Sequence, residues 1–284
     1  MIFLRALASL TRAHLLMFLR SRAALTWTLA FPLFFLFMFE FAFSGGTPRG
    51  ATYLMPGLFT ITLISGSFFG VALRMVTERE TGVLRRHRVT PVPAVAVILS
   101  HGATALAVLV CSVTLQAVMA RLVFRISVAG SAITLVIVLL LGGLALVPIG
   151  MIAGSIARDT RAAPAITNFL FFPMMFLSGA AIPFPFLPAW MQRFARLVPT
   201  TYLVESLQGV MVRGQGLGRL RGPLLVLALM SALGIGLNGL LFRWESTEPV
   251  RRGRVTLALS ALLLICTGAY FLAPPLEMAQ RPFR

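Results

Sequence analysis

The chain has 284 residues, of which 58% are hydrophobic and only 12% charged, and its mean hydropathy is +0.91. About a quarter of the residues of a soluble protein are charged, so the composition excludes that class and predicts an all-α integral membrane protein. The net charge of +17 does not indicate nucleic-acid binding, because the arginines cluster at the ends of apolar runs, where orientation signals are expected.

All 25 basic residues are arginine. A phosphate loop of the G-x-x-x-x-G-K-[ST] type and a Schiff base both need lysine, so we expect no cofactor on this chain, and any ATP to be bound by another chain. Cys111 and Cys266 lie in apolar runs and are interpreted as small buried side chains rather than a disulfide. His14, His87 and His101 share no ligand spacing, so the sequence supports no metal site.

Residues 2–20 are predicted to form an amphipathic helix that lies in the plane of the lipid headgroups. Its apolar face is expected to contain Phe3, Leu7, Leu10, His14, Leu15 and Phe18. A secretory signal peptide is the alternative, because the segment begins with basic residues, although no small-residue cleavage site follows a short apolar stretch.

About 20 apolar residues suffice to cross a bilayer, and six core spans plus a seventh are predicted. They are residues 25–43, 54–76, 95–120, 128–157, 162–182, 223–242 and 255–273. Pro32 is expected to kink the first span. Glu40, the one acidic residue inside a span, is interpreted as a snorkelling or packing residue rather than a proton relay. The seventh segment has an interfacial position as its alternative.

Arginine positions predict the orientation of these spans. With a cytoplasmic N-terminus, 15 of the 25 arginines fall on the inner side, as the positive-inside rule requires. Small residues in the fourth span, Gly142, Gly143, Gly150 and Gly154, allow close helix approach, either between two chains or within one. We therefore expect a multi-pass membrane protein with a cytoplasmic N-terminus.

The loop between the second and third spans, residues 77–91, is dense in charge. Thr77 and Glu80 have the spacing of a capping box, which predicts a short helix beginning at Thr77. Pro91 and Pro93 are expected to end that helix. A short basic helix that is rigidly connected to two spans would displace both spans when a force acts on it. A loop that only orients the protein is the alternative.

A proline-rich interval precedes the sixth span. Apolar residues between 187 and 198 follow helical spacing, with Trp190 as an interfacial anchor. Pro199 ends this segment, and a second short helix, residues 200–211, contains Glu205. The two helices either cap a transport path on the outer side or merely cover the fifth and sixth spans.

Three stretches have a recognisable combination of residues. They are Glu78-Arg-Glu-Thr-Gly-Val-Leu84 followed by Thr90-Pro91, the pair Phe176-Leu-Ser-Gly179 and Pro188-Ala-Trp190, and Pro199-Thr-Thr-Tyr202. Together they resemble the permease subunits of type-2 ABC exporters, the drug and lipo-oligosaccharide efflux group. The resemblance extends to about Trp244, which implies a permease domain at residues 1–244 and an extension at residues 245–284. The extra span and the plain apolar entry to the third span depart from the family pattern.

The resemblance implies roles for two sets of residues. The loop that couples to an ATPase would comprise Thr77, Glu78, Arg79, Glu80, Gly82, Leu84, Arg85 and Arg86, and the outer-side helices would use Ser178, Gly179, Pro188, Trp190, Pro199, Tyr202 and Glu205. In that arrangement Glu78 and Glu80 are expected to meet basic groups of the ATPase.

The implied partners are an ATPase chain in two copies, which binds ATP and Mg²⁺, a second permease chain forming a homodimer, and membrane lipids. The chain itself would then be no enzyme. Spans rich in Phe, Leu and Gly favour amphipathic substrates such as drugs, lipids or lipid-linked glycans. A proton-coupled secondary efflux transporter is the alternative function. A membrane enzyme is disfavoured, since no span contains a Ser/His/Asp, H-E-x-x-H or paired-carboxylate pattern.

Overall fold

The computed structural model describes residues 2–43, 48–88, 93–126 and 128–241, together with positions 253, 256, 260 and 268. Every regular element in this part of the chain is helical, which confirms the predicted all-α class. The N-terminal half contains α1 (Ile2–Arg20), α2 (Arg22–Phe43), α3 (Pro48–Ser65), the π-helix η1 (Gly66–Val71), α4 (Ala72–Glu80), α5 (Val83–Arg88) and α6 (Ala94–Phe124). The C-terminal half contains α7 (Ala132–Ile156), α8 (Ala162–Leu177), the 3₁₀ turn η2 (Phe184–Phe186), α9 (Ala189–Ala195), α10 (Pro199–Met211) and α11 (Arg221–Leu241).

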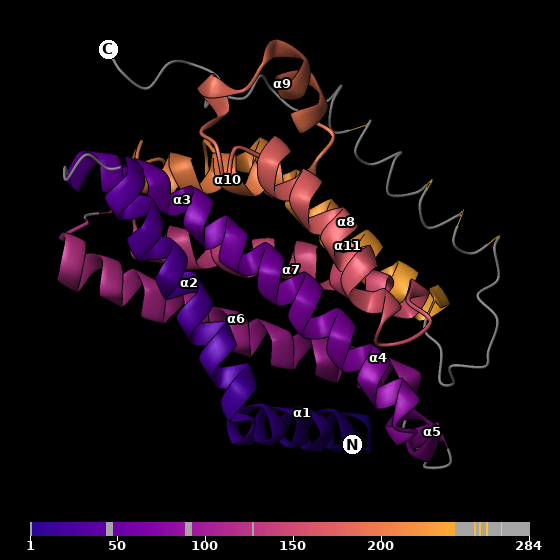
Figure 1. Cartoon of the computed structure of the whole chain (residues 1–284). Helices are drawn as coiled ribbons and strands as arrows, with labels where there is room; N and C mark the ends of the chain where they lie inside the picture. Colours follow the sequence, from indigo (N-terminus) through magenta and orange to yellow (C-terminus); the bar gives the residue numbers. More distant parts are fainter. Residues whose placement is uncertain are drawn as a thin grey trace.

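The long helices form a slanted bundle with distinct ends (Figure 1). Helix α1 lies across one end, where α5 is also found, and α9 lies at the opposite end. This position of α1 suits a helix in the headgroup plane, and the structure confirms the predicted helix over residues 2–20. His14 faces the protein and is buried, whereas Leu4 and Leu19 on other faces are exposed.

Four described helices are long and apolar enough to cross a membrane. They are Thr52–Glu80, which runs through α3, η1 and α4, then Val95–Phe124, Ala132–Ile156 and Arg221–Gly239. Each coincides with a predicted span. The predicted span 162–182 is a shorter helix, because α8 ends at Leu177 and Gly179 follows with a positive φ of 80°. Six or seven crossings therefore stay a prediction.

The remaining predicted spans are described only in part. Helix α2 covers the first of them and contains Pro32 in its interior. The side chain of Glu40 lies outside the described residues, as does the segment 255–273 except for positions 256, 260 and 268.

Helix α10 is the core of the C-terminal half. Every residue from Pro199 to Met211 is buried, and the helix packs against α3, α7 and α11. Its buried hydroxyls all have acceptors: Thr200 donates to Met174 O over 3.0 Å, Thr201 to Ala195 O over 2.6 Å and Tyr202 to Arg196 O over 2.8 Å. The second of the two predicted short helices is therefore an interior helix and not a surface cover.

Helix α7 approaches the α3–α4 segment closely through its glycines. A Cβ atom added at Gly150 would lie 1.9 Å from the backbone oxygen of Ser67, and one at Gly154 would lie 3.0 Å from Ala72 Cα. Gly142 and Gly143 likewise face Leu203 and Leu106 of the same chain. The small residues of this span thus serve packing within one chain, which decides between the two alternatives that the sequence left open.

The variant Gly150→Ala tests the close approach of α7 to the backbone at Ser67. The added methyl group meets backbone rather than a side chain that could move aside, so we expect a loss of about 1–3 kcal/mol in stability. Thermal unfolding of the detergent-solubilised protein measures it. Gly236→Ala in α11 is the matched control, because nothing lies within 4 Å of its added Cβ. Equal melting temperatures for the two variants would contradict the close approach.

Candidate functional site

The candidate site is the end of α4, where Glu78, Arg79 and Glu80 follow one another; we call these three residues and their partners the junction. Successive residues of an α-helix point about 100° apart, so the three side chains reach three different parts of the protein. All three side chains are charged. Two of them are nearly buried, with exposed fractions of 9% for Glu78 and 4% for Arg79. Buried charges are tolerated only with partners, and the junction supplies them.

Glu78 faces α1 and α6. Its Oε1 lies 3.6 Å from His14 Nε2 and its Oε2 lies 3.1 Å from His101 Nε2. The two imidazole rings stack with centroids 4.5 Å apart. The carboxylate therefore holds the amphipathic α1 and the long α6 to the same point on α4.

Arg79 faces the C-terminus of α7. Its Nη1 donates to Gly154 O over 3.2 Å, and its Nη2 donates to Ala157 O and, over 3.5 Å, to Arg158 O. The last carbonyls of a helix have no partner within it and carry partial negative charge. A guanidinium is suited to this position because its planar fork has several donors.

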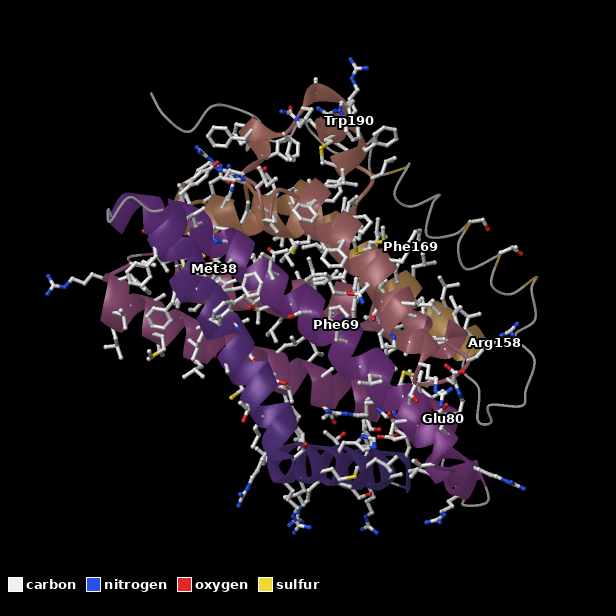
Figure 2. All side chains as sticks on the ribbon, in the orientation of Figure 1. Met38, Phe69, Glu80, Arg158, Phe169 and Trp190 are labelled. Carbon is white, nitrogen blue, oxygen red and sulfur yellow. The ribbon has the colours of Figure 1, made fainter. Side chains whose placement is uncertain are left out.

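Glu80 reaches the turn that follows α7. Its Oε1 accepts a hydrogen bond from the Thr160 N–H over 3.2 Å. In the same turn Asp159 Oδ1 accepts from the Ala162 N–H over 2.7 Å and so caps the start of α8. Figure 2 shows Glu80 and Arg158 at the same end of the bundle.

A short basic helix does follow the junction, but it begins later than predicted. Thr77 lies inside α4, where its hydroxyl donates to Leu73 O over 2.8 Å. The capping-box prediction was wrong because the second span continues as a helix through Thr77, leaving no free helix start there. The chain turns at Gly82, whose φ is +74°, and the short helix α5 starts at Val83. The end of that helix was predicted at Pro91, which lies outside the described residues.

The predicted loop residues thus divide into two groups. Glu78 and Arg79 are buried, and Leu84 is buried at the base of α5. Arg85 and Arg86 are exposed on α5. The expectation that Glu78 meets an ATPase is therefore wrong, since its carboxylate is engaged inside the chain.

The predicted outer-side residues lie at the other end of the bundle, where Figure 2 shows Trp190. Trp190 is 61% exposed on α9, as an interfacial anchor would be. Pro188 precedes α9 and Pro199 begins α10. Tyr202 is buried on α10, like Glu205, whose Oε1 pairs with Arg213 Nη2 at 2.6 Å.

The turn before α9 contains the other two predicted residues. The Ser178 hydroxyl donates to Met175 O over 3.3 Å and accepts from the Ala180 N–H, also over 3.3 Å. Gly179 supplies the positive φ of this turn. Ser178, Tyr202 and Glu205 therefore have structural contacts in this chain, and the exposed Trp190 packs edge-on against Phe194.

A groove of about 960 Å³ leads away from the junction. It is bounded by α1, α2, the α3–α4 segment, α6 and α8, and its walls are mostly apolar and aromatic; the phenylalanines that line it are Phe18, Phe35, Phe69, Phe171 and Phe172. Arg74 and Glu78 lie at one end. The π-helix η1 contributes Gly66, Phe69 and Gly70, and such helical irregularities are frequent at functional sites. The groove can accept an amphipathic molecule.

Sequence reasoning missed the histidines of the junction. His14 was assigned to the apolar face of a helix, and His101 was judged to lack ligand spacing. His14, His101 and Glu78 come from three different helices, so their spacing in the sequence could not predict that they are in contact. The only signal was a histidine on the apolar face of an amphipathic helix, His14, and a second histidine inside a predicted span, His101.

Comparison with known proteins identifies relatives. Residues 5–212 match the family described as ABC-2 type transporter. Over 157 residues the chain is 27% identical to the inner membrane transport permease YhhJ of Escherichia coli (strain K12), which covers 55% of this chain and 41% of that protein. Over 165 residues, 58% of this chain, it is 21% identical to ABC transporter G family member 20 of Dictyostelium discoideum, of which 23% is covered. The chain spans less than half the length of these relatives.

Arg79→Lys tests the junction. Lysine keeps the charge but replaces the fork by a single ammonium, so at least one of the three carbonyl contacts is lost. We expect a destabilisation of about 1–3 kcal/mol, measured by thermal unfolding in detergent. Arg86→Lys, on the exposed face of α5, should change the melting temperature little. A neutral Arg79→Lys would contradict the assigned contacts.

Proposed function

Because the chain belongs to the ABC-2 type transporter family, we propose that it is the permease subunit of an ATP-driven exporter that moves amphipathic substrates out of the cell across the inner membrane. The chain is a transport subunit and not itself an enzyme. ATP and Mg²⁺ would be bound by a separate ATPase chain. The observation that supports this proposal most is the junction, which connects α5 to several membrane helices at once.

The contacts of the junction suggest how force would pass from the ATPase. Helix α5 presents Arg85 and Arg86 to solvent, while buried Leu84 fixes it to the end of α4. A displacement of α5 would move α4, and through Arg79 and Glu80 it would move the α7–α8 turn. Through Glu78 it would also move α1 and α6. In this proposal the arginines dock on acidic groups of the ATPase, and the acidic residues of the loop transmit the motion.

The groove beside the junction supports an amphipathic substrate. Its aromatic walls suit an apolar body, and Arg74 and Glu78 at one end suit a polar head. We propose that two such chains, with two ATPase chains, enclose the complete path, and that residues 1–244 form the permease domain. Membership of an ABC family weighs against the proton-coupled alternative. The printed name of the Escherichia coli relative supports an inner-membrane location.

The proposed topology predicts the labelling of single cysteines. In a background with Cys111 and Cys266 replaced by alanine, a cysteine at Arg86 should react only from the cytoplasmic side. A cysteine at Arg193 in α9 should react only from the outer side, since α5 and α9 lie at opposite ends of the bundle (Figure 1). An impermeant maleimide applied to cells and to inverted vesicles distinguishes the two sides. Labelling of both positions from one side would refute the topology.

The coupling role predicts the effect of charge reversal on α5. Arg85→Glu with Arg86→Glu should reduce copurification of the ATPase and ATP-dependent export at least tenfold, whereas binding of substrate should be unchanged because the groove is untouched. Arg193→Glu with Arg219→Glu is the matched control, since these exposed arginines lie away from α5. Normal export by the α5 variant, with its ATPase bound, would reduce the loop to an orientation signal.

A further inference from the structure

Three side chains of the kinds that bind transition metals meet where α1, α4 and α6 converge. One ligand atom from each of His14, Glu78 and His101 lies within 4.8 Å of the other two, and all three residues are buried. They come from positions far apart in the chain, and no other such group is found among the described residues. The cluster is therefore built by the tertiary fold.

The contact between Glu78 and His101 is close but poorly aligned. Glu78 Oε2 and His101 Nε2 are 3.1 Å apart without the direction of a good hydrogen bond, and no other hydrogen-bond partner of either atom is found in the described part of the chain. Buried carboxylate oxygens are normally satisfied. A nitrogen and an oxygen that are close together but not aligned with each other have the arrangement expected of two ligands of a common ion.

We propose that His14, Glu78 and His101 bind one divalent transition metal ion, for which Zn²⁺ is the best probe. Zn–N bonds of 2.0–2.1 Å in tetrahedral geometry separate neighbouring ligand atoms by about 3.3 Å. The Glu78 oxygens lie at distances close to that value, Oε1 at 3.6 Å from His14 Nε2 and Oε2 at 3.1 Å from His101 Nε2, and one ligand atom of each residue lies within 4.8 Å of the other two. Two imidazoles and one carboxylate favour zinc and its neighbours over Mg²⁺ or Ca²⁺, which prefer oxygen ligands.

Binding requires a small rearrangement and leaves room for a further ligand. The imidazole rings now stack with an interplanar angle of 24°, so they must turn about their Cβ–Cγ bonds to direct both Nε2 atoms at one ion. Three protein ligands leave the fourth tetrahedral position to water. The groove is lined by both His14 and Glu78 and supplies an entry path for the ion and that water.

The charges around the site determine its affinity for the metal ion. Glu78 contributes one negative charge, and Arg74, one turn earlier, opposes the cation from a position over the Phe18 ring. We therefore expect weaker binding than in a structural zinc site made of thiolates. A bound ion would link α1 and α6 to the end of α4, and its occupancy would stiffen the junction. The proposed metal site does not depend on what the protein transports.

The test uses the purified full chain in detergent. Equilibrium dialysis against Zn²⁺ should give about one ion per chain, and Co²⁺ in its place should give the intense visible d–d bands of a tetrahedral site. Glu78→Gln and His101→Gln should each weaken binding at least tenfold. His87→Gln removes the third histidine of the chain, on α5, and should bind as the parent does.

A second measurement guards against variants that merely fold poorly. Zn²⁺ should raise the melting temperature of the parent and of His87→Gln, but not that of His101→Gln, relative to the same protein in chelator. The proposal is overturned if the parent binds no Zn²⁺, or if His87→Gln loses as much binding as His101→Gln. It is equally overturned if Zn²⁺ leaves the parent's melting temperature unchanged, which would mean a cluster held by hydrogen bonds alone.

Discussion

The burial of two opposite charges at the end of α4 is the constraint on which the rest of this structure depends. An ionised side chain inside a membrane bundle is costly unless it is paired or accepts and donates hydrogen bonds. Glu78 meets this need with two imidazoles, and Arg79 meets it with the carbonyls that end α7. Because each partner comes from a different helix, satisfying the charges fixes α1, α6 and α7 to one point. The stability of this end of the bundle therefore rests on these contacts.

The all-helical class and four of the long helices could be predicted from the length of the apolar runs. Where predictions from local sequence patterns failed, contacts between residues far apart in the sequence had determined the structure. The Thr77 and Glu80 pair has capping-box spacing, but the apolar span before it extends the helix, so Glu80 is free to reach the Thr160 N–H instead. Helix α10 has ordinary amphipathic spacing, and nothing in it signals that all of it is buried. The histidine contacts were equally invisible, because they join residues that only the fold brings together.

The dense packing of α7 connects the junction with distant parts of the chain. At one end α7 offers its last carbonyls to Arg79, and along its length Gly150 lets it touch the backbone at Ser67. Further along, Gly142 lies against Leu203 of the buried α10. Close packing of this kind transmits displacements, so a shift of α7 would be felt by both α4 and α10.

The π-helix η1 determines which way the charged end of α4 points. A π turn holds about one more residue than an α turn, so each residue after Val71 is rotated by roughly 100° compared with an uninterrupted α-helix. Without that rotation Glu78 would no longer face His14 and His101, and Arg79 would turn away from the end of α7. Ser67 and Phe68 of η1 lie against Gly150 of α7, the closest of the glycine contacts of α7. The close contact at Gly150 and the pairing of Glu78 and Arg79 thus both require the π-helix. These contacts also hold the π-helix in place.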